Sequence, residues 1–112
     1  MISVVMVQHD NYQLSIQAIA SLRQHHSIPY EIILVDNGST EEGAVRLENE
    51  FDGITVLRSD RNLEFGAANN AGAKLAKGDL LLFLNNDTII EPGIIDRLEG
   101  YFGQHPQCGA AG

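Results

Sequence analysis

The 112-residue chain has few of the residues that disulfide-bonded, zinc-binding and membrane-spanning proteins need. It has no tryptophan and a single cysteine, Cys108. One cysteine excludes an internal disulfide and a cysteine-based zinc site, and it favours a reducing, cytoplasmic setting. We expect Cys108 to be a small core residue. The longest run of large apolar residues, 80–84, is far shorter than the roughly 20 residues of a membrane-spanning helix, so we expect no transmembrane segment.

Basic residues are also scarce. Seven Lys and Arg stand against 15 Asp and Glu, which gives a net charge of −8. Binding to nucleic acid relies on clusters of Lys and Arg, so this balance argues against a nucleic-acid partner. A phosphate-bearing ligand of so acidic a chain would need a cation beside it.

The glycine-rich signatures of common α/β enzymes are missing. The turn after the first apolar segment is Gln8-His9-Asp10-Asn11, which lacks the glycines of a dinucleotide-binding fold. The chain also has no Gly-Lys-Ser/Thr of a P-loop and no Gly-x-Ser-x-Gly of an α/β-hydrolase. A receiver-type signalling domain fits poorly, because the strongest acids follow the second and fourth apolar segments.

Apolar segments of two periods alternate along the chain. Short β-branched or leucine-rich runs predict strands, and apolar residues at helical spacing predict helices between them. Residues 1–7 have no basic region or cleavage site, so they indicate a strand and not a signal peptide. The alternation predicts a single α/β domain over 1–112, Rossmann-like, with a mostly parallel sheet and helices on both faces. The expected strands are 2–7, 31–35, 54–57 and 80–84; the expected helices are 11–25, 40–51, 65–76 and 92–102, followed by an extended start at 107–112.

Several local features refine this prediction. Asp10 or Asn11 is a candidate N-cap of the first helix, and Gly78 is a candidate C-cap of the third. Pro92 suits the first position of the last helix. The run 80–84 indicates a central strand buried on both faces, whereas 54–57 should lie nearer an edge.

Two carboxylates follow predicted strands, Asp36 after the second and Asp87 after the fourth. The carboxyl ends of parallel strands share one edge of the sheet, where open α/β folds bind ligands. One carboxylate can accept a hydrogen bond from a pyrimidine imide, and the other can hold Mg²⁺ or Mn²⁺ on a diphosphate. The alternative is that Asn85-Asn86-Asp87 only ends a strand and opens a turn.

Three stretches together resemble family 2 glycosyltransferases with the GT-A fold, closest to rhamnosyltransferase-like members. They are Glu-Ile-Ile-Leu-Val-Asp-Asn-Gly-Ser-Thr at 31–40, Asn-Leu-Glu-Phe-Gly-Ala-Ala-Asn-Asn-Ala-Gly at 62–72, and Leu-Asn-Asn-Asp-Thr at 84–88. The last sits at the family's Asp-x-Asp-type metal motif. The resemblance covers essentially all 112 residues and implies a partial, truncated GT-A domain, the N-terminal nucleotide-sugar-binding half.

The resemblance implies roles at matching positions. The end of the first strand would pass beside the base, Asp36 would accept from the base, and Asp87 would hold the metal, with Asn85 and Asn86 near the sugar and ribose. The complete set implied for nucleotide-sugar binding is Val7, Gln8, His9, Asp36, Asn37, Asn62, Phe65, Gly66, Asn69, Asn70, Asn85, Asn86 and Asp87. The chain departs from the family at His9-Asp10, where Tyr-Asn is usual, at Glu64 in place of Gly, and at Asn85 in place of the first Asp.

The implied reaction is an inverting, metal-dependent transfer of a sugar from a UDP- or dTDP-linked donor to a saccharide or lipid-linked saccharide. Such a reaction belongs to cell-wall or polysaccharide biosynthesis, in the cytoplasm or at the inner face of the membrane. The family's general base lies in the acceptor-binding half, so we expect it beyond Gly112 and expect this chain alone to be inactive. Glu91, Asp96 and Glu99 come too early, and the last two indicate the solvent face of a helix.

Two other classes stay open: a non-catalytic nucleotide-sugar-binding module, and a small α/β interaction or signalling domain. A truncated sheet should expose apolar surface, so we also expect self-association.

Overall fold

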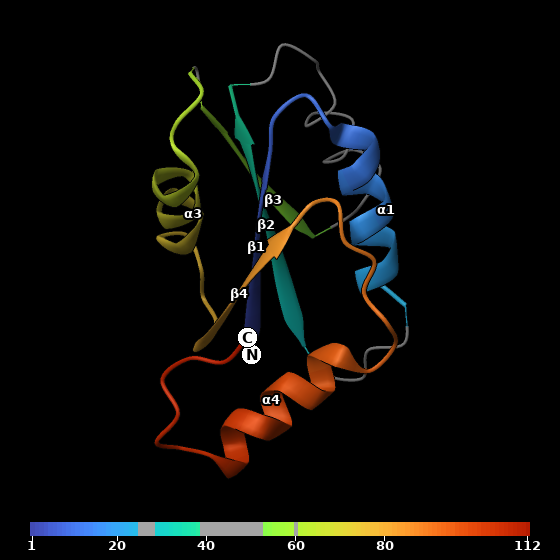
Figure 1. The fold of residues 1–112 in the computed structure, drawn as a ribbon, viewed down its shortest axis with the longest axis vertical. Coiled ribbons are helices and arrows are strands. Elements are labelled where there is room, and N and C mark those ends of the chain that lie inside the picture. Colours follow the sequence, from blue (N-terminus) through green and yellow to red (C-terminus); the bar gives the residue numbers. More distant parts are fainter. Residues whose placement is uncertain (25–28, 39–52, 60) are drawn as a thin grey trace.

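A computed structural model describes residues 1–24, 29–38, 53–59 and 61–112. Its four strands form one parallel sheet in the order β3-β2-β1-β4, as Figure 1 shows. The predicted α/β alternation is confirmed over these residues, and the helix predicted at 40–51 lies outside them. The elements are β1 (Ile2–Gln8), α1 (Tyr12–Leu22), β2 (Tyr30–Asn37), β3 (Ile54–Ser59), α3 (Phe65–Ala73), β4 (Leu80–Asn85) and α4 (Ile94–Gln104).

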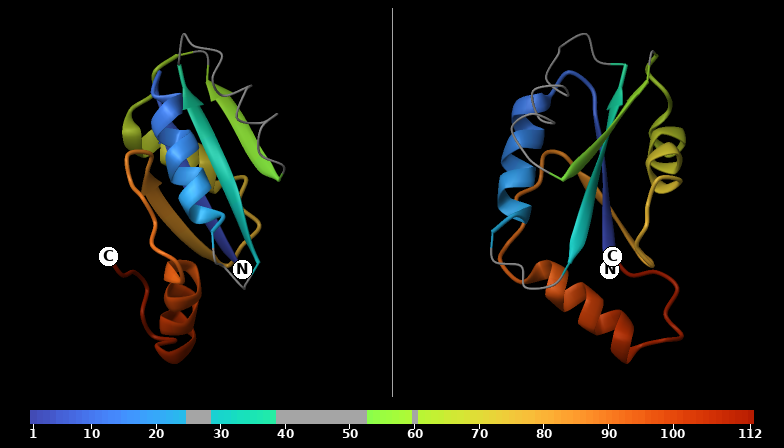
Figure 2. Two further views of the ribbon diagram at one scale, coloured as in Figure 1. Left: turned by 90° about the vertical axis from the view of Figure 1, so that its right-hand side faces the viewer. Right: turned by 180° about the vertical axis from the view of Figure 1, so that it is seen from behind.

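Helices cover both faces of the sheet, as predicted. Figure 2 shows α1 on one face and α3 on the other. Alternate residues of the strands turn to the α1 face, where they form the main hydrophobic core with the apolar stripe of α1. This core contains Val4, Met6, Ala18, Ile19, Leu22, Ile32 and Leu34, all fully buried or nearly so.

The opposite face packs closely against α3. A Cβ added at Gly72 of α3 would lie 2.7 Å from Val5 and 2.9 Å from Val35. Val5 and Val35 therefore point to the α3 face, and every second residue of β1 and β2 points the same way. This alternation determines which face of the sheet each residue at the strand ends occupies.

The strand β4 is not central among the residues that the structure describes. It forms one edge of the sheet, and β3 forms the other, as was predicted for residues 54–57. The prediction that 80–84 is buried on both faces is wrong. Its side chains alternate between half-buried and exposed, and Leu81 and Phe83 are 46% and 50% exposed. The reason is that α3 packs on β1 and β2, which leaves the same face of β4 uncovered.

The helix α4 lies across the amino ends of the strands, at the bottom of Figure 1. It anchors there through Ile95, which is fully buried in the core. Pro92 does not begin the helix, because Gly93 precedes Ile94 as the N-cap with φ 83°. Glu99 does not face only solvent either: one of its carboxylate oxygens is buried, and the other lies 3.7 Å from the amino group of Met1. Asp96 likewise has a buried carboxylate oxygen.

Other helix ends also differ from prediction. Asn11 occupies the N-cap position of α1, but its side chain makes no capping bond. The helix α3 ends at Ala73 with Lys74 as its C-cap, so Gly78 is not a cap. Gly78 is needed for another reason, because a Cβ there would lie 2.5 Å from the carbonyl oxygen of Met1.

The last residues, 107–112, form no strand. Cys108 is half-buried, is not part of the core cluster, and donates from Sγ to the carbonyl of Ala110 at 3.3 Å. The core position predicted for Cys108 is therefore wrong. None of the helices in the described parts of the chain is long and apolar enough to cross a membrane.

Candidate functional site

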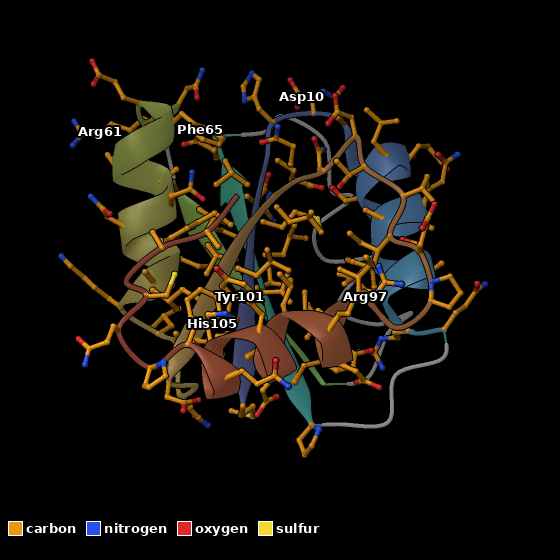
Figure 3. All side chains as sticks on the ribbon, turned by 60° about the horizontal axis from the view of Figure 1, so that its bottom comes forward. Asp10, Arg61, Phe65, Arg97, Tyr101 and His105 are labelled. Carbon is orange, nitrogen blue, oxygen red and sulfur yellow. The ribbon has the colours of Figure 1, made fainter. Side chains whose placement is uncertain are left out.

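Strand register brings the predicted site residues to one edge of the sheet. Val7 of β1 pairs with Val35 of β2 on one side and with Asn85 of β4 on the other. Adjacent strands lie about 4.8 Å apart, so the ends of β2 and β4 stand about 10 Å apart, on either side of β1. The amino end of α3 reaches this edge too, at the top of Figure 1. Figure 3 shows Asp10, Arg61 and Phe65 at this end of the molecule, with Arg97, Tyr101 and His105 on α4 at the other.

Asp36 lies on the α1 face of the strand end and is 1% exposed. Arg58 of β3, its partner in register, donates from Nε to Asp36 Oδ2 at 3.1 Å. Asp36 Oδ1 is buried, and none of the described residues donates a hydrogen bond to it. Gln8 of β1, which pairs with Asp36, likewise has a buried Oε1 with no donor in the described parts of the chain. The structure thus places Gln8 and Asp36, two of the predicted site residues, side by side. Each has one side-chain oxygen that could accept a hydrogen bond from a ligand.

The arginine beside Asp36 was not among the predicted site residues. Its signal was present in the sequence, because Arg58 follows the apolar residues of a predicted strand. Only the register of β3 against β2 shows that Arg58 faces Asp36.

Asn37 lies on the opposite, α3 face and is 4% exposed. Its Nδ2 donates to Asn62 Oδ1 and to the carbonyl oxygen of Leu63, both at 2.8 Å. Its Oδ1 accepts from the Leu63 amide at 2.7 Å. The side chain is therefore occupied by the segment that enters α3, and Leu63 is a partner that the sequence did not indicate.

His9 lies beside Asn37 at the end of β1. Its Nδ1 is 2.7 Å from the carbonyl oxygen of Asn37. A carbonyl can only accept, so Nδ1 carries the hydrogen and donates. His9 Nε2 lies 3.6 Å from Asp10 Oδ2, and the His9 side chain is 47% exposed. The ring is thus held at one edge while much of its surface stays open to solvent.

The start of α3 exposes an aromatic ring and open backbone. Phe65 is 62% exposed, and a Cβ added at Gly66 would meet no atom within 4 Å. Of the two asparagines predicted to line the nucleotide, Asn69 is buried and donates to the carbonyl of Phe65 at 3.1 Å within its own helix. Asn70 is exposed.

The turn after β4 presents Asp87 to solvent. Thr88 Oγ1 donates to the carbonyl of Asn85 at 2.6 Å and closes the turn. Asn86 Nδ2 donates to Ser15 Oγ at 3.2 Å, which ties the turn to α1. Asp87 itself is exposed. The amide before it is thus used for positioning, and the carboxylate remains available.

The residues at this edge could bind a metal ion together with a phosphate ligand. Across the described ranges, no three His, Cys, Asp or Glu side chains lie close enough to hold an ion. Mg²⁺ is commonly held by one or two carboxylates with substrate phosphates as further ligands. Asp87 fits that mode, because it is a single exposed carboxylate at the end of a strand.

A groove of about 520 Å³ lies elsewhere, along the exposed face of β4 and against α4. Its walls are mostly apolar, and the sequence did not predict it. It is lined by Leu81, Phe83, Leu98, Phe102, Ala110 and Ala111, among others. The groove does not include the strand-end residues described above.

Comparison with known proteins identifies the family. The family model described as glycosyl transferase family 2 matches residues 3–112. The chain is 36% identical over 115 residues to the O-antigen biosynthesis protein RfbC of Myxococcus xanthus, covering 99% of the chain and 9% of that protein. It is 30% identical over 106 residues to an uncharacterized glycosyltransferase of Haemophilus influenzae, covering 95% of the chain and 36% of that protein.

Solved structures show the same fold. Residues 1–349 of S. aureus TarS in complex with UDP-GlcNAc match with a TM-score of 0.84 at 21% identity, over 94% of this chain and 32% of that one. The complex of the same protein with UDP matches with a TM-score of 0.80. The chain spans between 9% and 36% of the length of the proteins named here. Its sheet and flanking helices are those of a GT-A glycosyltransferase, and the chain belongs to glycosyltransferase family 2.

Proposed function

We propose that this chain binds the donor in an inverting enzyme that transfers a sugar from a UDP- or dTDP-linked donor to a hydroxyl acceptor. The observation that carries the proposal is the meeting of the β1, β2 and β4 ends with the start of α3 at one edge. This is the edge at which open α/β sheets bind ligands. Membership of the family and the fold shared with a UDP-GlcNAc-bound protein support it.

The base would lie beside the end of β1. The half-exposed ring of His9 offers it a flat surface. An imide N–H needs an acceptor. Asp36 Oδ1 is an acceptor with no donor among the residues that the structure describes, since Arg58 contacts only Oδ2. Because Oδ1 is buried on the α1 face, this contact requires a local movement of the strand end.

The diphosphate would lie between the start of α3 and the turn after β4. Helix amino ends favour anions, and Asp87 would hold Mg²⁺ or Mn²⁺ on the phosphate oxygens. Such an ion, when bound, offsets the charge of the leaving diphosphate. The bound ion would also reduce the electrostatic repulsion between the diphosphate and a chain of net charge −8.

The acceptor side of the reaction belongs to the whole protein. We place there the general base that deprotonates the hydroxyl of a saccharide or lipid-linked saccharide. A lipid-linked acceptor would put the reaction at the inner, cytoplasmic face of a membrane, in cell-wall or polysaccharide biosynthesis. The described residues then bind and orient the donor, and the isolated chain should show no transfer.

Calorimetric titration of the chain with UDP tests this function. We expect binding that weakens at least about tenfold when Mn²⁺ is left out, and equally in Asp87→Ala, because about 1.4 kcal/mol of contact is lost. UMP, which lacks the second phosphate, should show no Mn²⁺ dependence.

The matched control is Asp79→Ala. Asp79 is an exposed residue directly before β4, at the end of the strand opposite to Asp87. Its substitution by alanine changes the net charge by the same amount but lies away from the site. No binding at millimolar UDP would contradict donor binding and favour an interaction domain. Equal losses in Asp79→Ala and Asp87→Ala would contradict a metal contact at Asp87.

A further inference from the structure

Asn37 joins two segments that are far from it in sequence. Through its side chain it holds Asn62 and Leu63, 25 and 26 positions away, and through its carbonyl it accepts from His9, 28 positions away. His9 follows β1, and Asn62 lies in the segment that leads into α3. Asn37 therefore fixes the distance between these two sides of the proposed donor site.

The carboxamide of Asn37 has little left to offer a ligand. Both of its N–H groups are used, one toward Asn62 Oδ1 and one toward the Leu63 carbonyl, and Oδ1 already accepts from the Leu63 amide. The three distances, 2.7–2.8 Å, are those of well-formed bonds, and the residue is 4% exposed. Its hydrogen-bonding groups face the chain and not the open edge.

The neighbouring glycine allows this close approach. Gly38 has φ 69°, and a Cβ on it would lie 2.5 Å from the amide nitrogen of Asn62 and 2.6 Å from the carbonyl carbon of Arg61. The Gly38 amide also donates to the carbonyl of Ser59 at 3.1 Å. The end of β2 and the segment entering α3 are thus fitted together by backbone and side chain.

The arrangement requires an amide at this position. An aspartate has nearly the same shape but no N–H, so it would set a carboxylate against the oxygens of Asn62 and Leu63. We infer that Asn37 is a positioning residue of the donor site, which holds the Asn62–Leu63 segment and His9 in place and does not itself contact the nucleotide. That the positioned site binds a nucleotide rests on the proposed function. That Asn37 holds the Asn62–Leu63 segment does not depend on it.

Two measurements on the same variants test the inference. The first, without ligand, is amide exchange at Leu63 by NMR, which should become at least about tenfold faster in Asn37→Ala because the amide loses its acceptor. The second is UDP affinity in a double-mutant cycle. Asn37→Ala should weaken UDP about tenfold, and adding Asn62→Ala should change it less than about twofold more, because both substitutions release the same segment.

Asn37→Asp supplies an isosteric second variant in case Asn37→Ala does not fold. It should also bind UDP about tenfold more weakly. Gln104→Glu is the same amide-to-carboxylate change at an exposed position of α4, at the other end of the molecule. It should leave UDP affinity unchanged.

Three results would overturn the inference. They are UDP affinity losses of Asn37→Ala and Asn62→Ala that multiply in the double variant, tighter UDP binding by Asn37→Asp, and an unchanged exchange rate of the Leu63 amide in Asn37→Ala. If the wild-type chain fails to bind UDP, the proposed function fails. The exchange of Leu63 still decides whether Asn37 holds the segment.

Discussion

Arg58 of β3 donates from Nε to the carboxylate of Asp36 in the neighbouring strand β2, over 3.1 Å, near the carboxyl edge of the sheet. Asp36 is almost fully buried, whereas Arg58 is 45% exposed along its side chain. Removing one partner of a buried pair leaves an uncompensated charge, which is more costly than the pair is favourable. The ion pair therefore holds the buried carboxylate in place.

Arg58→Ala should lower the free energy of unfolding by about 2 kcal/mol, below the range for fully buried pairs because Arg58 is partly solvated. Urea unfolding followed by circular dichroism measures the loss. Arg97→Ala, an exposed arginine on α4, is the matched control and should change stability by less than about 0.5 kcal/mol. Equal effects of the two substitutions would show that the Asp36 contact contributes no stability.

Glu31 should make stability depend on acid pH. Burial alone would raise its pKa, but hydrogen bonds from Ser3 Oγ and the amides of Lys77 and Gly78 hold the pKa below its usual 4.5. A group with a lowered folded pKa stabilises above its unfolded pKa and loses that contribution as pH falls through the folded one.

We therefore expect Glu31→Gln to lower the free energy of unfolding by about 1 kcal/mol near neutral pH. The difference from wild type should shrink steadily as pH falls below 4.5 and Glu31 becomes protonated. Urea unfolding of both proteins across this range measures it. A difference that stays constant with pH would mean that the ionised form of Glu31 has no special role.

Two glycine substitutions should have opposite signs. Gly38→Ala places a Cβ at positive φ and 2.5 Å from Asn62 N, so it should destabilise by about 2–3 kcal/mol. Gly100→Ala lies within α4 with nothing within 4 Å, so it should stabilise by up to about 1 kcal/mol through helix propensity. Thermal unfolding of the two variants should move the midpoint in opposite directions. A stabilising Gly38→Ala would contradict the close approach.

The uncovered face of β4 should make the isolated chain self-associate. Leu81 and Phe83 are exposed there, and β4 ends the sheet within the described residues, so its outer backbone groups can pair with another chain. Sedimentation at increasing concentration should show dimers. Phe83→Ser should weaken them at least about tenfold.

The control for this surface is Leu75→Ser, because Leu75 is 42% exposed in the segment after α3 and does not line the groove along β4. It should leave the association unchanged. A monomer at all concentrations, or equal weakening by both substitutions, would count against a β4 interface.

The sequence by itself determined the order of the described elements and the edge of the sheet at which the candidate site residues lie. Apolar runs such as 32–35 are legible because a parallel strand covered by helices must be apolar on both sides. Polar residues that follow such runs, such as Asp36 and Asp87, must then gather at one edge, since parallel strands end together. The family resemblance also rested on these residues and was confirmed.

Only the tertiary structure decided what each polar side chain does. Asp36 and Asn37 are adjacent in sequence but point to opposite faces, one to Arg58 and the other to Leu63. Both partners come from segments more than 20 positions away, and strand register, which sequence pattern does not reveal, brings them together. The same holds for β4: its five apolar residues look like a buried strand, and their exposure depends on where α3 packs.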